Sequence, residues 1–106
     1  MDKAAIVIAD TAGVIRFWSE GARDAFGHSA DGALGQTLDL IVPQEYRDRH
    51  WAGFKRAIAS GSASIEGQTI PLPVLKADGG IENHSGRLTI LRAGEGRVIG
   101  CMVIFG

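Results

Sequence analysis

The sequence predicts an α+β domain, a five-stranded antiparallel sheet with helices covering one face. Three observations predict it. Short apolar runs rich in β-branched residues lie near both ends of the chain, the middle carries helical spacing with helix caps, and the last three runs are separated by short glycine-containing turns. Consecutive hairpins build antiparallel sheets, and helices gathered in one block pack on one face of a sheet.

The first two strands are predicted to form a hairpin. Residues 5–9 (AIVIA) and 14–18 (VIRFW) are rich in β-branched and aromatic side chains, which favour extended backbone. Residues 10–13 (DTAG), between them, are typical of a tight turn.

Three helical segments follow. Ser19 is a helix-capping residue, and the helix after it is expected to end at Gly27. Residues 29–34 resemble one more helical turn. The longest helix is expected over residues 43–59, because a proline suits its first turn and the Ser-Gly-Ser sequence at 60–62 ends it.

The remaining chain is predicted to form three strands joined by hairpins. The strands are expected over residues 65–75, 81–91 and 98–105. The turns between them are ADGG at 77–80 and AGEG at 93–96.

Length and composition indicate one soluble globular domain spanning residues 1–106. The chain has 45% hydrophobic residues and a formal charge of -1, so nothing suggests attraction to nucleic acid or to an anionic membrane. No apolar run approaches the roughly 18 residues needed to cross a bilayer. The single cysteine, Cys101, excludes an internal disulfide and fits a reducing compartment, so we expect a cytoplasmic protein.

We do not expect an enzyme. The sequence has no Ser/His/Asp trio in a recognisable local motif, no glycine pattern that cradles phosphate and no HExxH zinc signature.

The most informative single residue is His50, in the longest predicted helix. A spacing of four residues places it on one face with Tyr46, Phe54 and Ile58, where an apolar side chain would normally pack. A buried neutral imidazole needs either a hydrogen-bond partner or a metal. On its residue type alone, a lone histidine on such a face is more often a hydrogen-bonded core residue than a ligand.

Taken in order, several short motifs resemble the PAS sensory domains over essentially the whole chain. The motifs are IADTAGVI at 8–15, WSEGA at 18–22, FGHS at 26–29, LG at 34–35, KADG at 76–79 and IGCMVIF at 99–105. This resemblance implies the PAS fold. It does not by itself give the function, because PAS pockets hold haem, flavin, small acids or nothing.

The longest helix resembles that of haem-binding PAS oxygen sensors of the rhizobial sensor-kinase type. The resemblance is carried by EYRDRH at 45–50, followed by Phe54, Arg56 and ASG at 59–61. It implies haem b as the cofactor, His50 as the ligand to iron and Arg56 as the partner of a haem propionate. Both roles are chemically reasonable, because neutral imidazole ligates haem iron and a guanidinium can hold a carboxylate with two hydrogen bonds. The charged residues around Arg56 can equally be the solvated side of an amphipathic helix.

The opposite wall of the expected pocket departs from the oxygen sensors. The alignment places Ile70 where those proteins carry an arginine that donates a hydrogen bond to oxygen. In the strand 81–91, alternation places His84, Gly86, Leu88 and Ile90 on the inward face. His84 is a candidate donor or sixth ligand, or a histidine at the rim, and Gly86 is expected to leave room for a ligand. The expected lining residues of the cofactor are Tyr46, Phe54, Ile65, Ile70, Leu72, His84, Gly86, Leu88 and Ile90.

These interpretations predict a sensory domain that detects a diatomic gas (oxygen, carbon monoxide or nitric oxide) and relays it to an effector domain, such as a histidine kinase or a cyclic-dinucleotide enzyme. A homodimer is possible. The family usually continues beyond the last strand into an output segment containing Asp and Thr, which this sequence does not include. The alternative is a cofactor-free or small-ligand PAS domain that acts as a dimerisation or interaction module. Flavin photochemistry that forms a cysteine adduct is disfavoured, because the only cysteine, Cys101, lies in the last predicted strand and not in a helix.

Overall fold

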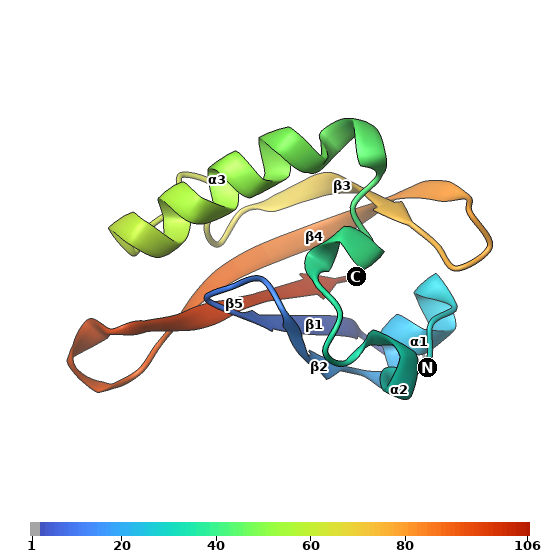
Figure 1. Ribbon diagram of the computed structural model, residues 1–106, viewed down its shortest axis with the longest axis horizontal. Coiled ribbons are helices and arrows are strands. Elements are labelled where there is room, and N and C mark those ends of the chain that lie inside the picture. The colour runs from blue at the N-terminus through green and yellow to red at the C-terminus, as the bar shows by residue number, and fades with distance from the viewer. Residues whose placement is uncertain (1–2) are drawn as a thin grey trace.

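The computed structural model describes residues 3–106 and consists of one sheet with helices on one side of it (Figure 1). The strands are β1 (Ala5–Asp10), β2 (Ile15–Trp18), β3 (Thr69–Leu75), β4 (Ile81–Arg92) and β5 (Val98–Phe105). The helices are α1 (Glu20–Phe26), α2 (Ala30–Ala33) and α3 (Arg47–Ser60), with 3-10 turns η1 (Leu38–Leu40), η2 (Gln44–Tyr46) and η3 (Gly94–Gly96).

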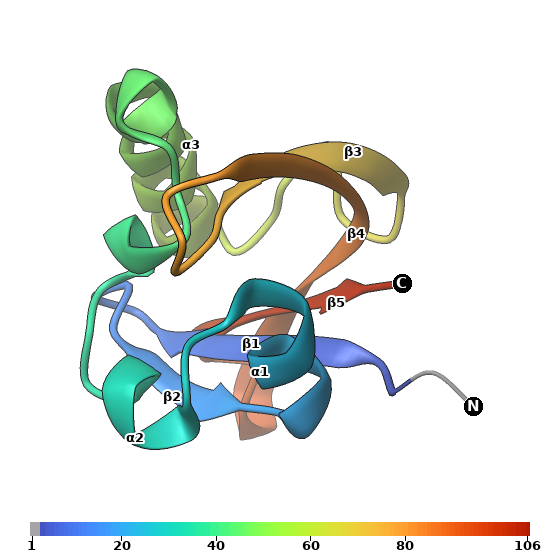
Figure 2. The ribbon, with the colours of Figure 1, turned by 90° about the vertical axis from the view of Figure 1, so that its right-hand side faces the viewer.

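The five strands pair in the order β2-β1-β5-β4-β3, and every pairing is antiparallel. The last strand is therefore central, with Val103 opposite both Val7 of β1 and Leu88 of β4. Figure 2 shows α1, α2 and α3 on the same side of the curved sheet. The predicted α+β class, the antiparallel sheet and the covered face are confirmed.

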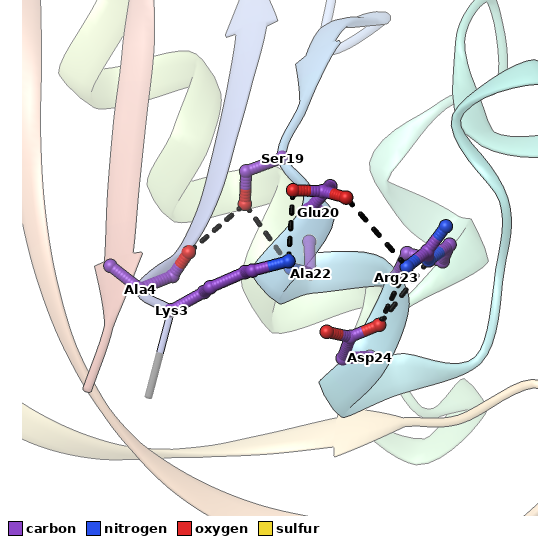
Figure 3. A network of polar contacts seen from close by, with 7 residues as sticks. All are labelled: Lys3, Ala4, Ser19, Glu20, Ala22, Arg23 and Asp24. Atoms are coloured by element: carbon purple, nitrogen blue, oxygen red, sulfur yellow. Dashed lines mark hydrogen bonds and ion pairs between the residues drawn. The ribbon is translucent and has the colours of Figure 1, made fainter. Parts of the chain in front are cut away.

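Ser19 joins the first helix to the first strand. Its hydroxyl accepts a hydrogen bond from the amide of Ala22 (3.1 Å) and donates to the carbonyl of Ala4 (3.1 Å) (Figure 3). It also accepts a hydrogen bond from the amide of Ile6 (2.8 Å). Gly27 ends the helix in the left-handed conformation, at a φ of 89°. The predicted caps are confirmed, and they place α1 directly against β1.

Two predicted boundaries are wrong. The first turn of the long helix is the 3-10 turn η2, and α3 begins at Arg47. The strand predicted from residue 65 begins only at Thr69. The Glu66 carboxylate accepts the amide of Ile90 (2.9 Å), and the amide of Gly67 donates to the carbonyl of Leu88 (2.9 Å). These contacts with β4 keep residues 64–67 in a turn.

The core lies between the inner face of the sheet and α1, α2 and η1. Its aromatic centre is Phe26, which meets Trp18 and Phe105 edge-on at ring separations of 6.0 and 5.0 Å. Helix α3 contributes no buried residue. It therefore covers its part of the sheet only loosely, and this is where the candidate site lies.

The turn between β1 and β2 depends on Gly13. Its φ of 80° is a left-handed conformation, and a Cβ at this position would overlap the ring of Trp51 in α3. We predict that Gly13→Ala destabilises the domain by roughly 1–2 kcal/mol for the backbone conformation and a further 1–3 kcal/mol for displacing the ring, as measured by urea unfolding. Gly35→Ala is the matched control, because Gly35 has a φ of 87° with nothing within 4 Å of its added Cβ. Equal destabilisation of the two variants would contradict a close Trp51 contact.

Candidate ligand site between α3 and the sheet

The inner stripe of α3 is half-buried along its whole length. Its members are Tyr46, just before the helix, and His50, Phe54 and Ile58. Across from the helix, three apolar side chains on the inner face of the sheet are also only half-buried, namely Leu72, Leu88 and Val103. Two apolar surfaces that pack around the same core without burying each other fully are suited to holding a ligand between them.

His50 is packed among aromatic rings. The Trp51 ring meets it edge-on at 4.9 Å, and the Phe54 ring lies nearly parallel to it at 6.0 Å. Its Nδ1 is buried and has no hydrogen-bond partner among the described residues. Burial lowers the pKa of His50 below its usual value, partly opposed by the negative charge of Asp39. The imidazole is therefore held in its neutral form, which is the form that binds a metal.

Asp39, in η1, connects the core to α3. Its Oδ1 accepts a hydrogen bond from Trp51 Nε1 at 2.7 Å, and its carbonyl accepts one from Arg47 Nη2 at 3.2 Å. Sequence reasoning missed both partners, because contacts that span 8 and 12 residues and join two different elements leave no local signal.

Arg56 lies on the exposed side of α3 and forms no ion pair within residues 3–106. It is free to meet an anionic group at the surface.

The sheet residues named from the sequence have different environments. Ile90 is buried (3% exposed), and Ile70, Leu72 and Leu88 are half-buried. Ile65 is 38% exposed and lies in the turn before β3. Gly86 leaves no free space, because the side chain of Leu72 occupies the volume that a Cβ on Gly86 would need.

His84 lies elsewhere, near the start of β4. Its ring meets Phe26 edge-on at 5.2 Å, and its Nε2 is 3.2 Å from the Glu82 carboxylate. It lines an open cavity of about 590 Å³ together with Asp24, Ala25 and Phe105, and no residue of α3 lines that cavity. The structure therefore does not bring His84 and His50 to one cavity.

No group of three or more His, Cys, Asp or Glu side chains within residues 3–106 is placed to hold a metal ion. Within these residues a metal would therefore need most of its coordination from a cofactor such as a porphyrin.

The strand order β2-β1-β5-β4-β3, with one helical block between β2 and β3, defines the class of fold to which the domain belongs. A family model described as "PAS fold" matches residues 2–105. The chain belongs to the PAS family, the sensory domains of signalling proteins, which are commonly linked to effectors such as histidine kinases and which commonly dimerise.

One relative, an uncharacterized protein of Azorhizobium caulinodans, is 33% identical over 100 residues. The match covers 93% of this chain and 14% of the relative, so the chain spans only about a seventh of that protein.

Solved structures with the same fold include a PAS domain of a protein from Colwellia psychrerythraea (TM-score 0.82, 20% identity, covering 97% of this chain and 84% of that chain). They also include a light-oxygen-voltage domain studied with a flavin analogue (TM-score 0.76, 20% identity, 98% and 76%). A third is the PAS domain of the histidine kinase ThkA (TM-score 0.63, 16% identity, 96% of each chain). At these identities the likeness concerns the fold alone.

None of the helices in the described part of the chain is both long enough and apolar enough to cross a membrane.

The environment of His50 predicts a pH dependence of stability. Because its pKa is lowered in the folded state from the usual 6.5, the unfolded chain binds more protons as the pH falls through that value. The free energy of unfolding should therefore decrease from pH 7.5 to below pH 6. His50→Gln should flatten this decrease, and His28→Gln is the control. Urea unfolding across this range is the measurement, and equal slopes for both variants would show that His50 is not the group responsible.

Cys101 should be unreactive in the folded domain. Burial raises the pKa of its thiol to about 11, so very little thiolate is present near pH 8. We expect a disulfide reagent to modify the single thiol only at the rate of unfolding, and promptly in denaturant. Rapid labelling of the native protein would contradict the burial of this residue.

Proposed function

We propose that this PAS domain is a non-enzymatic input module that holds haem b between α3 and the inner face of the sheet, with His50 as the ligand to iron, and responds to a diatomic gas. The observation that carries the proposal is the buried, unpartnered Nδ1 of a neutral imidazole on a half-buried inner stripe. Buried polar atoms without partners are rare in folded proteins and often belong to a functional site.

The residues on the helix side fit the group. His50 would ligate the iron, Phe54 and Tyr46 would pack beside the porphyrin, and the free guanidinium of Arg56 would meet a propionate. When bound, haem supplies the iron that takes a gas molecule.

The sheet side determines which gas suits the site. Ile70, Leu72 and Leu88 present no hydrogen-bond donor, and His84 is turned to Glu82 outside this region. Carbon monoxide needs little help from a pocket, whereas oxygen needs a donor. These residues therefore favour carbon monoxide over stable oxygen binding.

The signal is proposed to pass to an effector domain of the full-length protein, such as a histidine kinase or a cyclic-dinucleotide enzyme, in a homodimer. Support comes from the PAS family and from the similar domain of a histidine kinase. Leu88 lies on β4, next to central β5, and Leu72 lies on β3, which pairs with β4, so pressure on them would reach β5 through β4.

The second candidate is a cofactor-free or small-ligand PAS domain that mediates dimerisation or contacts. Two observations favour it: Leu72 fills the space next to Gly86, and His50 already packs against Trp51 and Phe54. A flavin that forms an adduct is less suited, because the only cysteine is Cys101, buried in β5.

Absorption spectra after haem reconstitution separate the two candidates. We predict a Soret band for the wild type, loss or a marked shift of that band in His50→Ala, and an unchanged band in the control His28→Ala. We expect Arg56→Ala to weaken haem binding by about twofold to fivefold, as for an exposed ion pair, and the neighbouring Lys55→Ala to leave it unchanged. Identical spectra for wild type and His50→Ala would refute the ligand assignment, and a colourless wild type would favour the second candidate.

A further inference from the structure

The orientation of α3 is not set by burial alone. None of its residues is fully buried, so the nonpolar contacts that normally fix a helix on a sheet are weak here. A helix with a half-buried stripe can rotate about its axis at low cost, and such a rotation would turn His50 away from the sheet.

Directional contacts from one residue, Asp39, oppose such a rotation. Arg47, three residues before His50, donates to the Asp39 carbonyl (3.2 Å), and its Nε lies 3.7 Å from Oδ1. Trp51, one residue after His50, donates to the same Oδ1 at 2.7 Å. One residue on each side of His50 is thus bound to position 39, Trp51 through the carboxylate and Arg47 through the backbone carbonyl, and Arg47 Nε also donates to the Val42 carbonyl at 3.1 Å. Hydrogen bonds constrain direction in a way that apolar packing does not.

Asp39 is itself firmly placed. Its neighbour Leu38 is buried, and the Leu38 amide donates to the carbonyl of Gly13 at 2.9 Å. Ile41 is also buried, and its carbonyl accepts the amide of Leu75 in β3 at 2.9 Å. The 3-10 turn η1 is therefore tied both to the β1–β2 turn and to the far edge of the sheet.

The same arrangement keeps the imidazole nitrogen free. The negative charge of Asp39 partly offsets the lowering of the His50 pKa by burial. The Oδ1 atom of Asp39 accepts the Trp51 indole N–H, and Nδ1 of His50 has no partner among the described residues.

We propose that Asp39 is the positioning residue of the site: by holding the Trp51 indole through its carboxylate, next to the Arg47 contact with its backbone carbonyl, it fixes the rotation of α3 and keeps the imidazole on the inner side of the domain. The positioning can be measured without any cofactor, and its use for haem rests on the function proposed above.

The test uses the apo protein, in which only two indoles and three imidazoles have to be resolved. In Asp39→Ala we expect the Trp51 indole N–H to exchange with solvent about tenfold faster, because it loses a hydrogen bond to a charged acceptor. Trp18, whose indole donates to the His28 carbonyl at 2.8 Å, is the internal control and should not change. The ring-nitrogen NMR signals of His50 should shift, and those of His28 and His84 should not.

Two further variants separate positioning from general damage. Asp39→Asn retains a side-chain oxygen for the indole and should restore most of the wild-type exchange rate and His50 signals. Trp51→Phe keeps a ring over Gly13 but removes the donor, so the His50 signals of the folded variant should move as in Asp39→Ala, while those of His84 should not. Asp24→Ala, which removes an exposed aspartate paired with Arg23 far from α3, is the matched control.

Unchanged His50 signals in both Asp39→Ala and Trp51→Phe would overturn the proposal.

Haem titration of the same proteins distinguishes failure of the positioning proposal from failure of the proposed function. A wild type that takes up no haem defeats the proposed function, while the apo spectra still decide whether Asp39 positions His50. If haem is taken up, Asp39→Ala should release it several-fold faster than wild type and Asp39→Asn should be close to wild type. Equal release rates in all three would also overturn the proposal.

Discussion

The pairing of β5 between β1 and β4 is the constraint on which the rest of the structure depends. It makes β2 and β3 the two edges of the sheet, although only residues 19–68 separate them along the chain. That segment must travel from one edge to the other, and it does so across the inner face. The helices and the loops between them are therefore gathered over one surface, and the candidate site lies between that segment and the sheet.

Local signals were sufficient to predict the elements but not how the helical segment meets the sheet. The hydroxyl of Ser19 and the left-handed Gly27 act within a few residues of the helix they cap, so the sequence shows them directly. The bounds of β5 follow in the same way from a run of β-branched residues. The predicted start of β3 at residue 65 was wrong because the Glu66 carboxylate accepts a hydrogen bond from the Ile90 amide, and that contact spans 24 residues. The anchoring of Trp51 by Asp39 was missed for the same reason, whereas the stripe of His50 was visible as a simple spacing of four.

His50 Nδ1 is the single buried side-chain nitrogen or oxygen in the described chain that lacks a partner. An unpaired buried polar group costs about 1–3 kcal/mol, which is a large share of the stability of a small domain. A carboxylate lies near enough to influence the ring, but its Oδ1 accepts the indole of Trp51. This cost is explained if the nitrogens of this ring are needed for a ligand. It is not explained if the ring only fills space, because a leucine or phenylalanine would pack among Trp51 and Phe54 without it.

The two ends of α3 are held in a way that suits such a role. At its start, Arg47 and Trp51 bind Asp39, and after its end Arg92 donates to the Gly61 carbonyl at 2.5 Å while pairing with Glu66. Polar contacts hold the start of the helix to η1 and the residue after its end to β4, and the stripe between them is only half-buried. A ligand placed against this stripe would add apolar burial where the fold has left it incomplete, and the held ends would oppose movement of the helix. The resulting pressure would then fall on Leu72 and Leu88, on the strands that connect the site to β5.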